Sequence, residues 1–329
     1  MLKYTALFVA LSFTMFSCKK GDDGSNPTPI VPPVVLPDTL SAGWQKINID
    51  STESFSDVFF NTITNGCLSG KNKIYKTIDG GNNWVLASQD KKFMNLGVTP
   101  SGNVFGIPEF TPPYNDSIYK STDGGVSFST TPSADYLLDV FFTDNNNGFV
   151  TNVNSVMYTT NAGISWNKIL VAGSSASYRS LFYRNANLGW LVDGHYITRQ
   201  NGPVQNWQTT WQFTTVGDIA QIGNILVAIH AASDNIVYTL SNLGDLYKST
   251  NAGATFTLVK NFGTGSDVHF ISDNVGYVCS SKRLYKTING GSTWTVEVAL
   301  GNQYFSEIHF TDATHGWACG NKGLILKFN

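Results

Sequence analysis

Charged residues are scarce in this sequence, and arginine is the scarcest of them. Only 13% of the 329 residues are charged, and the formal net charge is −2. The chain has four arginines: Arg179, Arg184, Arg199 and Arg283. Nucleic-acid binding needs a cluster of cations that neutralises several phosphates. We therefore expect no nucleic-acid partner.

Cysteines are also few, and the apolar run at the start of the chain is short. Beyond Cys18 there are three cysteines, an odd number that cannot pair fully within one chain. We expect Cys67, Cys279 and Cys319 to be small buried apolar residues. The apolar run 4–16 is too short to span a membrane.

The N-terminal residues instead have the features of a secretory signal, because a lysine precedes the apolar run and a small residue and a cysteine follow it. Cys18 resembles the lipidated cysteine of bacterial lipoproteins; an ordinary signal peptide with a chance cysteine is the alternative. We expect a signal peptide at 1–17, a lipidated, Pro-rich tether at 18–41 and a folded domain at 42–329.

The charged residues directly after Cys18 resemble the surface-export signal of lipoproteins in Bacteroidetes-type bacteria. This resemblance implies a protein at the outer membrane or cell surface, facing the periplasm or the exterior. Its contact with the membrane would be through the N-terminal lipid only.

One phrase recurs along the rest of the chain, and its full form is Tyr-Lys-Thr-x-Asp-Gly-Gly-x-x-Trp. Five copies span residues 75–84, 119–128, 158–166, 247–256 and 285–294, and a damaged sixth spans 197–207. A period of about forty residues with one turn phrase in each period predicts a β-propeller. The 31 glycines suit such a turn-rich, all-β chain.

Each copy of the phrase predicts a strand, a tight turn and a second strand. Asp or Asn followed by Gly-Gly or Ala-Gly favours the turn, and the aromatic residue opens the next strand. The phrase resembles the Asp-box, or bacterial neuraminidase repeat, which implies a turn staple away from any chemistry. The turn residues are Asp79, Asp123, Asn161, Asn251 and Asn289, and the aromatic residues are Trp84, Phe128, Trp166, Phe256 and Trp294.

The number of blades follows from these aromatic residues. The phrases give six, with Trp207 in the damaged copy, and Trp44 opens a seventh strand with no phrase before it. Residues 305–329 lack a final strand, which 43–49 can supply. We therefore predict seven four-stranded blades, with the ring closed by the N-terminal strand 43–49 in the C-terminal blade.

A second signal precedes most phrases. It is an acidic-apolar-x-Phe strand, such as 57–60 or 139–142, followed by an Asp/Asn-rich turn and a Gly-aromatic pair. Together with the phrase, this pattern over residues 43–329 resembles the photosystem II assembly and stability factor family. The resemblance implies a seven-bladed propeller without enzymatic activity that holds membrane-protein subunits during assembly.

The acidic position at the start of these strands is a candidate site. If the strands begin at one mouth of the channel, the side chains form a partial acidic ring that attracts a cation or a Lys/Arg-rich segment. Alternatively, each acid bonds the backbone of its own turn. Blade five is ambiguous between Asp218 and Ala228. The other positions are Asp57, Asn95, Asp139, Ser180, Asp267 and Glu307.

The connections that vary in length lie on the same predicted face. They fall at 105–117, 170–178 and 208–223. Variable loops on a rigid scaffold often carry binding sites, although simple drift in loop length is the competing explanation. Four aromatic residues could form a contact surface there: Phe110, Tyr114, Tyr178 and Trp211.

No catalytic, cofactor or metal site is predicted. A sialidase needs three arginines from different blades, and a glycosidase needs a carboxylate pair that no spacing singles out here. His269 and His309 are repeat-equivalent, and we favour partly buried residues over a metal pair. The leading hypothesis is a non-enzymatic scaffold for an envelope protein or peptide. The alternative is a cell-surface glycan-binding protein or glycosidase.

Overall fold

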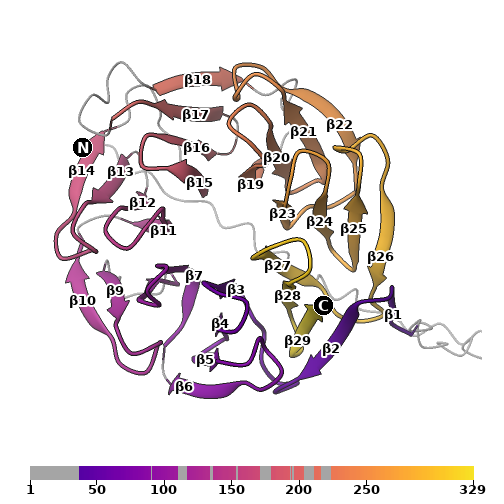
Figure 1. Cartoon of the computed structure of the whole chain (residues 1–329), viewed down its shortest axis with the longest axis horizontal. Helices are drawn as coiled ribbons and strands as arrows, with labels where there is room; N and C mark the ends of the chain where they lie inside the picture. Colours follow the sequence, from indigo (N-terminus) through magenta and orange to yellow (C-terminus); the bar gives the residue numbers. More distant parts are fainter. Residues whose placement is uncertain are drawn as a thin grey trace, which may run out of the picture. The chain divides into compact units, whose positions relative to one another are not determined.

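The computed structural model describes residues 37–89, 91–109, 117–133, 136–152, 155–170, 179–192, 194, 196–203, 211–215 and 224–329. Within these ranges all regular secondary structure is β-strand, arranged in seven sheets. The sheets lie as blades around a central axis (Figure 1). The predicted all-β, seven-bladed propeller is confirmed. No helix in these ranges is long and apolar enough to cross a membrane.

Blades one to four follow one another along the chain as antiparallel sheets, each with its first strand at the axis (Figure 1). Their strands are rich in β-branched and aromatic residues, which suit a pleated, buried surface. The strands are β3 (Asp57–Phe60), β4 (Gly66–Ser69), β5 (Lys73–Thr77) and β6 (Val85–Gln89); β7 (Phe93–Val98), β8 (Val104–Pro108), β9 (Ser117–Ser121) and β10 (Ser129–Pro132); β11 (Leu137–Phe142), β12 (Gly148–Asn152), β13 (Ser155–Thr159) and β14 (Asn167–Leu170); and β15 (Ser180–Asn185), β16 (Leu188–Val192), β17 (Tyr196–Asn201) and β18 (Trp211–Thr215).

Blades five to seven repeat this order, and blade seven takes its outer strand from the N-terminal part of the chain. Blade six has a fifth, two-residue strand at its outer edge. The strands are β19 (Leu226–Ala231), β20 (Val237–Ser241), β21 (Asp245–Ser249) and β22 (Thr257–Asn261); β23 (Asp267–Phe270), β24 (Gly276–Ser280), β25 (Arg283–Thr287), β26 (Thr295–Ala299) and β1 (Thr39–Leu40); and β27 (Phe305–Phe310), β28 (Gly316–Gly320), β29 (Leu324–Phe328) and β2 (Trp44–Asn48).

The ring closes as predicted, because β2 pairs antiparallel with β29 and places Trp44 opposite Phe328. Gly43 allows the entry into this strand: its φ is +93°, and a Cβ there would lie 2.7 Å from the Phe328 ring. The pairing of β1 with β26 was not predicted from the repeat pattern. Asp38, just before β1, accepts the N–H of Gly301 at 2.9 Å and ion-pairs with Lys46 at 2.7 Å. Both N-terminal strands are therefore fixed to the ring.

The phrase also joins neighbouring blades. A second-strand aromatic residue donates to a carbonyl of the next blade's phrase: Trp317 Nε1 bonds Gly80 at 3.0 Å, and Tyr238 OH bonds Gly290 at 3.1 Å. The ring of Trp317 stacks on Phe60 with their centroids 3.4 Å apart. The second glycine of the phrase makes room for this contact, since a Cβ on Gly81 would lie 2.9 Å from Trp317 Nε1.

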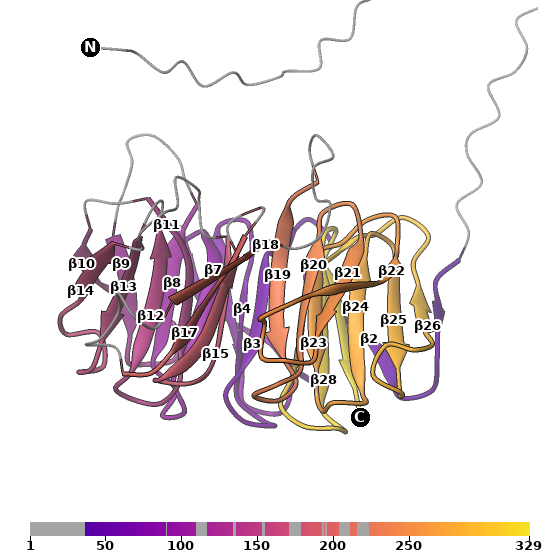
Figure 2. The ribbon, with the colours of Figure 1, turned by 90° about the horizontal axis from the view of Figure 1, so that it is seen from above.

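The turns divide between two faces at opposite ends of the strands (Figure 2). The turn after each first strand lies beside the phrase, as shown by the 2.8 Å bond from Gly80 N–H to the Thr64 carbonyl. We call this end the phrase face. The turns between second and third strands, and the connections between blades, lie at the other end, which we call the cavity face.

Blade four departs from the prediction at its damaged phrase. Gln200 lies opposite Gly189, as Thr77 lies opposite Gly66 in blade one, and Gln200 pairs with Trp211. Trp211 therefore opens β18 at the phrase face. The prediction that Trp211 lies in a variable connection was wrong, and the strand does not open at Trp207, which lies outside the described residues. The reason is that blade four has extra residues between Gln200 and Trp211, which pair with each other. Gln200 Nε2 donates to the carbonyls of Ala186 and Gly202 and so holds the altered turn.

Candidate functional site

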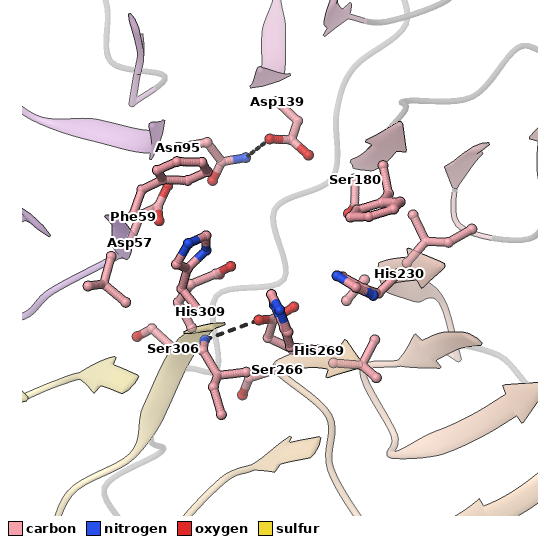
Figure 3. Close-up of a pocket in the computed structure, with 18 of the residues that line it drawn as sticks. Asp57, Phe59, Asn95, Asp139, Ser180, His230, Ser266, His269, Ser306 and His309 are labelled. Carbon is pink, nitrogen blue, oxygen red and sulfur yellow. Dashed lines mark hydrogen bonds between the residues drawn. The ribbon is translucent and has the colours of Figure 1, made fainter. Parts of the chain in front are cut away.

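A cavity of about 560 Å³ lies on the axis, between the first strands of the blades. Its wall consists of two rings of side chains, shown in part in Figure 3. Residues two apart in a strand point to the same side, so each first strand has one position in each ring. We call the ring nearer the cavity face the acidic ring, formed by Asp57, Asn95, Asp139, Ser180, Ala228, Asp267 and Glu307. We call the next one the aromatic ring, formed by Phe59, Phe141, Phe182, His230, His269 and His309; blade two has Gly97 at this position of its first strand.

Strand register shows that the members of the acidic ring are equivalent. Asp57 lies opposite Ser69, Asp139 opposite Thr151 and Glu307 opposite Cys319. These three pairs occupy the same position in the register of the first and second strands of their blades. In blade five, Ala228 lies opposite Leu240 and takes this position. The structure therefore assigns the blade-five position to Ala228. Asp218, the other candidate, lies outside the described residues.

The aspartates of the ring bond the backbone of the next blade. Asp57 Oδ2 accepts the N–H of Leu96 at 2.5 Å, and Asp139 Oδ2 accepts that of Leu181 at 2.9 Å. Asp267 Oδ2 accepts the N–H of Ile308 at 3.1 Å. The alternative was that each acid bonds the backbone of its own turn. The structure shows instead that each of these aspartates bonds the backbone of the next blade. The acids still line the cavity, so the two roles coexist.

The acids are held in an environment that opposes their ionisation. Burial, with a smaller contribution from the charges of Asp139 and Asp267, raises the pKa of Asp57 to about 7. Burial likewise raises the pKa of Asp139 to about 7 and that of Asp267 to about 6. Burial and the three neighbouring carboxylates raise the pKa of Glu307 well above its usual range. Near neutral pH the cavity therefore holds a mixture of carboxyl and carboxylate groups.

The aromatic ring lines the part of the cavity that is farther from the cavity face. His269 lies 4.3 Å from the His230 ring and 5.6 Å from the His309 ring between centroids. Phe59 lies 4.5 Å from His309, and Phe182 lies 4.1 Å from His230. Burial lowers the pKa of His230 to about 3 and that of His309 to about 4, so both imidazoles are neutral at physiological pH.

His230 was not singled out from the sequence. It is equivalent to His269 and His309, but the long connection before β19 hides the repeat register of blade five. Within the described residues, no group of three or more His, Cys, Asp or Glu side chains could hold a metal ion. The cysteines of the described residues, Cys67, Cys279 and Cys319, are buried and free.

Of the predicted contact surface, Phe110, Tyr114 and Tyr178 lie outside the described residues, as does Cys18. Trp211 lies at the phrase face, away from the cavity. Three other tyrosines are exposed at the cavity face: Tyr136, Tyr196 and Tyr304. Tyr136 and Tyr304 directly precede β11 and β27, and Tyr196 is the first residue of β17. Their position was not predicted from the sequence.

The phrase residues lie on the opposite face and form hydrogen-bonded turns. Thr77 Oγ1 donates to Asp79 Oδ1 at 2.8 Å, which also accepts the N–H of Asn83 at 2.9 Å. Thr77 Oγ1 accepts the N–H of Gly81 at 2.9 Å. Turns of the same kind form at Asp123, Asn161, Asn251 and Asn289. The following aromatic residues are half-buried beside the sheets: Trp84, Phe128, Trp166, Phe256 and Trp294.

We expect Asp79→Ala to lower the free energy of unfolding by about 1–2 kcal/mol, because it removes the acceptor of several turn hydrogen bonds. Asp79→Asn alone should also destabilise, since Asn83 Nδ2 donates to Asp79 Oδ2 at 2.7 Å. The double variant Asp79→Asn/Asn83→Thr rebuilds the pair formed by Asn289 and Thr293 and should restore stability. Chemical denaturation measures all three; an unstable double variant would contradict the staple role.

No family model matches the chain. In sequence the chain is 25% identical over 264 residues to photosystem II stability/assembly factor HCF136, chloroplastic, of Oryza sativa subsp. japonica. That alignment covers 75% of this chain and 60% of the relative, so the chain spans less than two thirds of the relative's length.

Two solved propellers superpose on the chain. The structure described as YCF48 bound to D1 peptide does so with a TM-score of 0.69 at 19% identity, covering 91% of this chain and 99% of that chain. A catalytically inactive virginiamycin B lyase from Staphylococcus aureus with quinupristin has a TM-score of 0.71 at 11% identity, covering 86% and 98%. At these identities both likenesses show the fold.

Proposed function

We propose that this chain, a homologue of photosystem II stability/assembly factor HCF136, is a non-enzymatic propeller that binds a segment of another protein on its cavity face. The observation that carries the proposal is the axial cavity of about 560 Å³, lined by four acidic side chains and by the three imidazoles and three phenylalanines of the aromatic ring. A cavity of this size and lining accepts part of a peptide. The similar propeller YCF48 is described with a D1 peptide bound, which supports a peptide ligand here.

The geometry of the acids favours binding over glycoside hydrolysis. A glycosidase needs one carboxyl group to donate a proton and a second to attack or to activate water. Here Asp57, Asp139 and Asp267 each accept an amide N–H of the next blade. These bonds fix the carboxylates as part of the scaffold. The glycan alternative has no comparable support from the cavity.

The proposed place of action is the cell envelope. A signal peptide at 1–17 and a lipid on Cys18 would put the propeller at the outer membrane or cell surface, held by the tether that follows. The partner would then be another envelope protein that presents an extended segment. The N-terminal composition supports this proposal.

Site-specific photo-crosslinking in cells tests the proposal. A benzoylphenylalanine at Tyr304, on the cavity face, should crosslink to one segment of one envelope protein. The same group at Ile164 or Ile288, both highly exposed on the phrase face, is the matched control and should not. Equal labelling from both faces, or none from the cavity face, would contradict the proposal. Cys18→Ala should move the protein to the soluble fraction and abolish the crosslink.

A further inference from the structure

The acidic residues are unevenly distributed around the cavity. Asp267, Glu307 and Asp57 belong to blades six, seven and one, which are consecutive in the closed ring, and Asp139 lies in blade three. Blades four and five contribute Ser180 and Ala228, whose small side chains leave space beside the acids. A ligand in this space has carboxyl groups on several sides.

His230 gives an independent indication of a ligand. It is 9% exposed and its ring points into the cavity (Figure 3). Its Nδ1 accepts the N–H of Phe270 at 3.4 Å, which leaves the proton on Nε2. No group in the described part of the chain accepts a hydrogen bond from Nε2. This N–H faces the cavity on an otherwise buried side chain and is available to donate to a ligand acceptor, such as a peptide carbonyl.

The bonds already made by the acids limit which cation fits. Both oxygens of Asp139 accept amide N–H groups, from Leu181 and Val140, and Oδ1 also accepts Asn95 Nδ2 at 2.9 Å. Asp57 and Asp267 each accept the amide N–H of the next blade and that of the residue after them, and Asp267 is also hydrogen-bonded to Glu307. Guanidinium prefers a carboxylate with both oxygens open to a parallel pair of donors. Separate single acceptors on different blades instead suit the three divergent N–H bonds of an ammonium group.

We infer that this cavity binds one primary ammonium group of the partner, carried by a lysine side chain or by a free N-terminus, with His230 donating to a carbonyl near that group. The inference rests on the proposed function and names the chemistry recognised. Methylene groups beside the ammonium would pack on the aromatic ring, where Phe59, Phe141 and Phe182 line the cavity. Arg179, at the rim in blade four, would disfavour a second cation beside the first.

Binding should depend on pH. The titratable or charged groups that line the cavity are Asp57, Asp139, Asp267, Glu307, His230, His269, His309 and Arg179. The acids have raised pKa values, and an ammonium ion stabilises their ionised forms, so binding releases protons. Affinity should therefore rise between pH 5.5 and pH 7, a range in which the imidazoles remain neutral and both kinds of ammonium group remain charged.

Calorimetric titration of the full chain with four capped tripeptides tests the inference. Acetyl-Ala-Lys-Ala-amide carries only the side-chain ammonium, and Ala-Ala-Ala-amide carries only the terminal one. Acetyl-Ala-Arg-Ala-amide and the acetyl-lysine form of the first peptide are the controls. At least one ammonium peptide should bind at least tenfold more tightly than both controls, and the tighter of the two identifies the source. Its affinity should rise with pH.

Variants at matched positions complete the test. Asp57→Asn should weaken the preferred peptide at least tenfold, whereas Asp144→Asn, which changes an acid in a phrase-face turn, should leave its affinity unchanged. Melting curves verify that both variants fold, and the comparison among peptides does not depend on them. Equal binding of lysine and acetyl-lysine peptides, tighter binding of the arginine peptide, or no binding at all would overturn the inference. Crosslinking of a partner from Tyr304 does not depend on the ammonium group, so it tests the proposed function separately from this inference.

Discussion

Replacing Trp44 with alanine is expected to lower the free energy of unfolding by about 3–5 kcal/mol, the range for truncating a large buried aromatic side chain. Trp44 is 5% exposed and packs against Tyr277, Phe310 and Phe328 at centroid distances of 6.2, 6.1 and 5.2 Å. These contacts join β2 to blades six and seven. Trp44 thus packs the strand that closes the ring against two blades, and denaturant unfolding measures the loss.

Two control variants distinguish the loss of ring closure from a general loss of buried apolar contacts. Trp44→Phe keeps an aromatic ring in the same place. It should recover more than half of the free energy of unfolding that Trp44→Ala loses. Trp84→Ala removes the equivalent side chain of blade one, whose outer strand continues directly into blade two. Hydrogen exchange at the amides of β29 should rise in Trp44→Ala and not in Trp84→Ala. Equal exchange in the two variants would count against a special role of Trp44 in closure.

Much of the fold could be predicted because the same physical requirement recurs in every blade. Each phrase must turn tightly and leave space for the aromatic residue of the preceding blade, which restricts its residues to Asp or Asn with Gly. Trp44 followed from the same pattern, since it lacked a phrase and the last blade lacked a strand. The pattern failed in blade four, where the Gln200 amide replaces the Thr hydroxyl and displaces the aromatic residue to Trp211.

The site could be predicted only in part, because repeats describe contacts within a blade better than contacts between blades. The acidic position recurs in sequence, but nothing in its spacing shows that Asp139 reaches the backbone N–H of Leu181 in the next blade. His230 was missed because the connection before β19 varies in length. The two-residue strand β1 has no pattern of its own, and its pairing depends on the edge of β26.

The cavity places two kinds of titratable group in one buried space, and their effects on stability oppose each other. The folded pKa of Asp139 is about 7, above its ordinary value, so its contribution to stability is full below pH ~4 and is lost as pH rises through about 7. The folded pKa of His230 is about 3, below its ordinary value. Its contribution is full above pH ~6.5 and is lost as pH falls through about 3. In the wild-type protein the two trends offset each other between these limits.

Single substitutions should reveal the two trends with opposite signs. Because Asp139→Asn removes a group that destabilises at high pH, its stability relative to wild type should rise by about 2 kcal/mol from pH 4.5 to pH 8. His230→Phe introduces the residue that blade four has at the equivalent position, Phe182, and its relative stability should instead fall by a similar amount over this range. Denaturant unfolding at several pH values measures both slopes, and any constant offset from packing is the same at every pH. Two slopes of the same sign would contradict the assignment of raised carboxyl and lowered imidazole pKa values to this cavity.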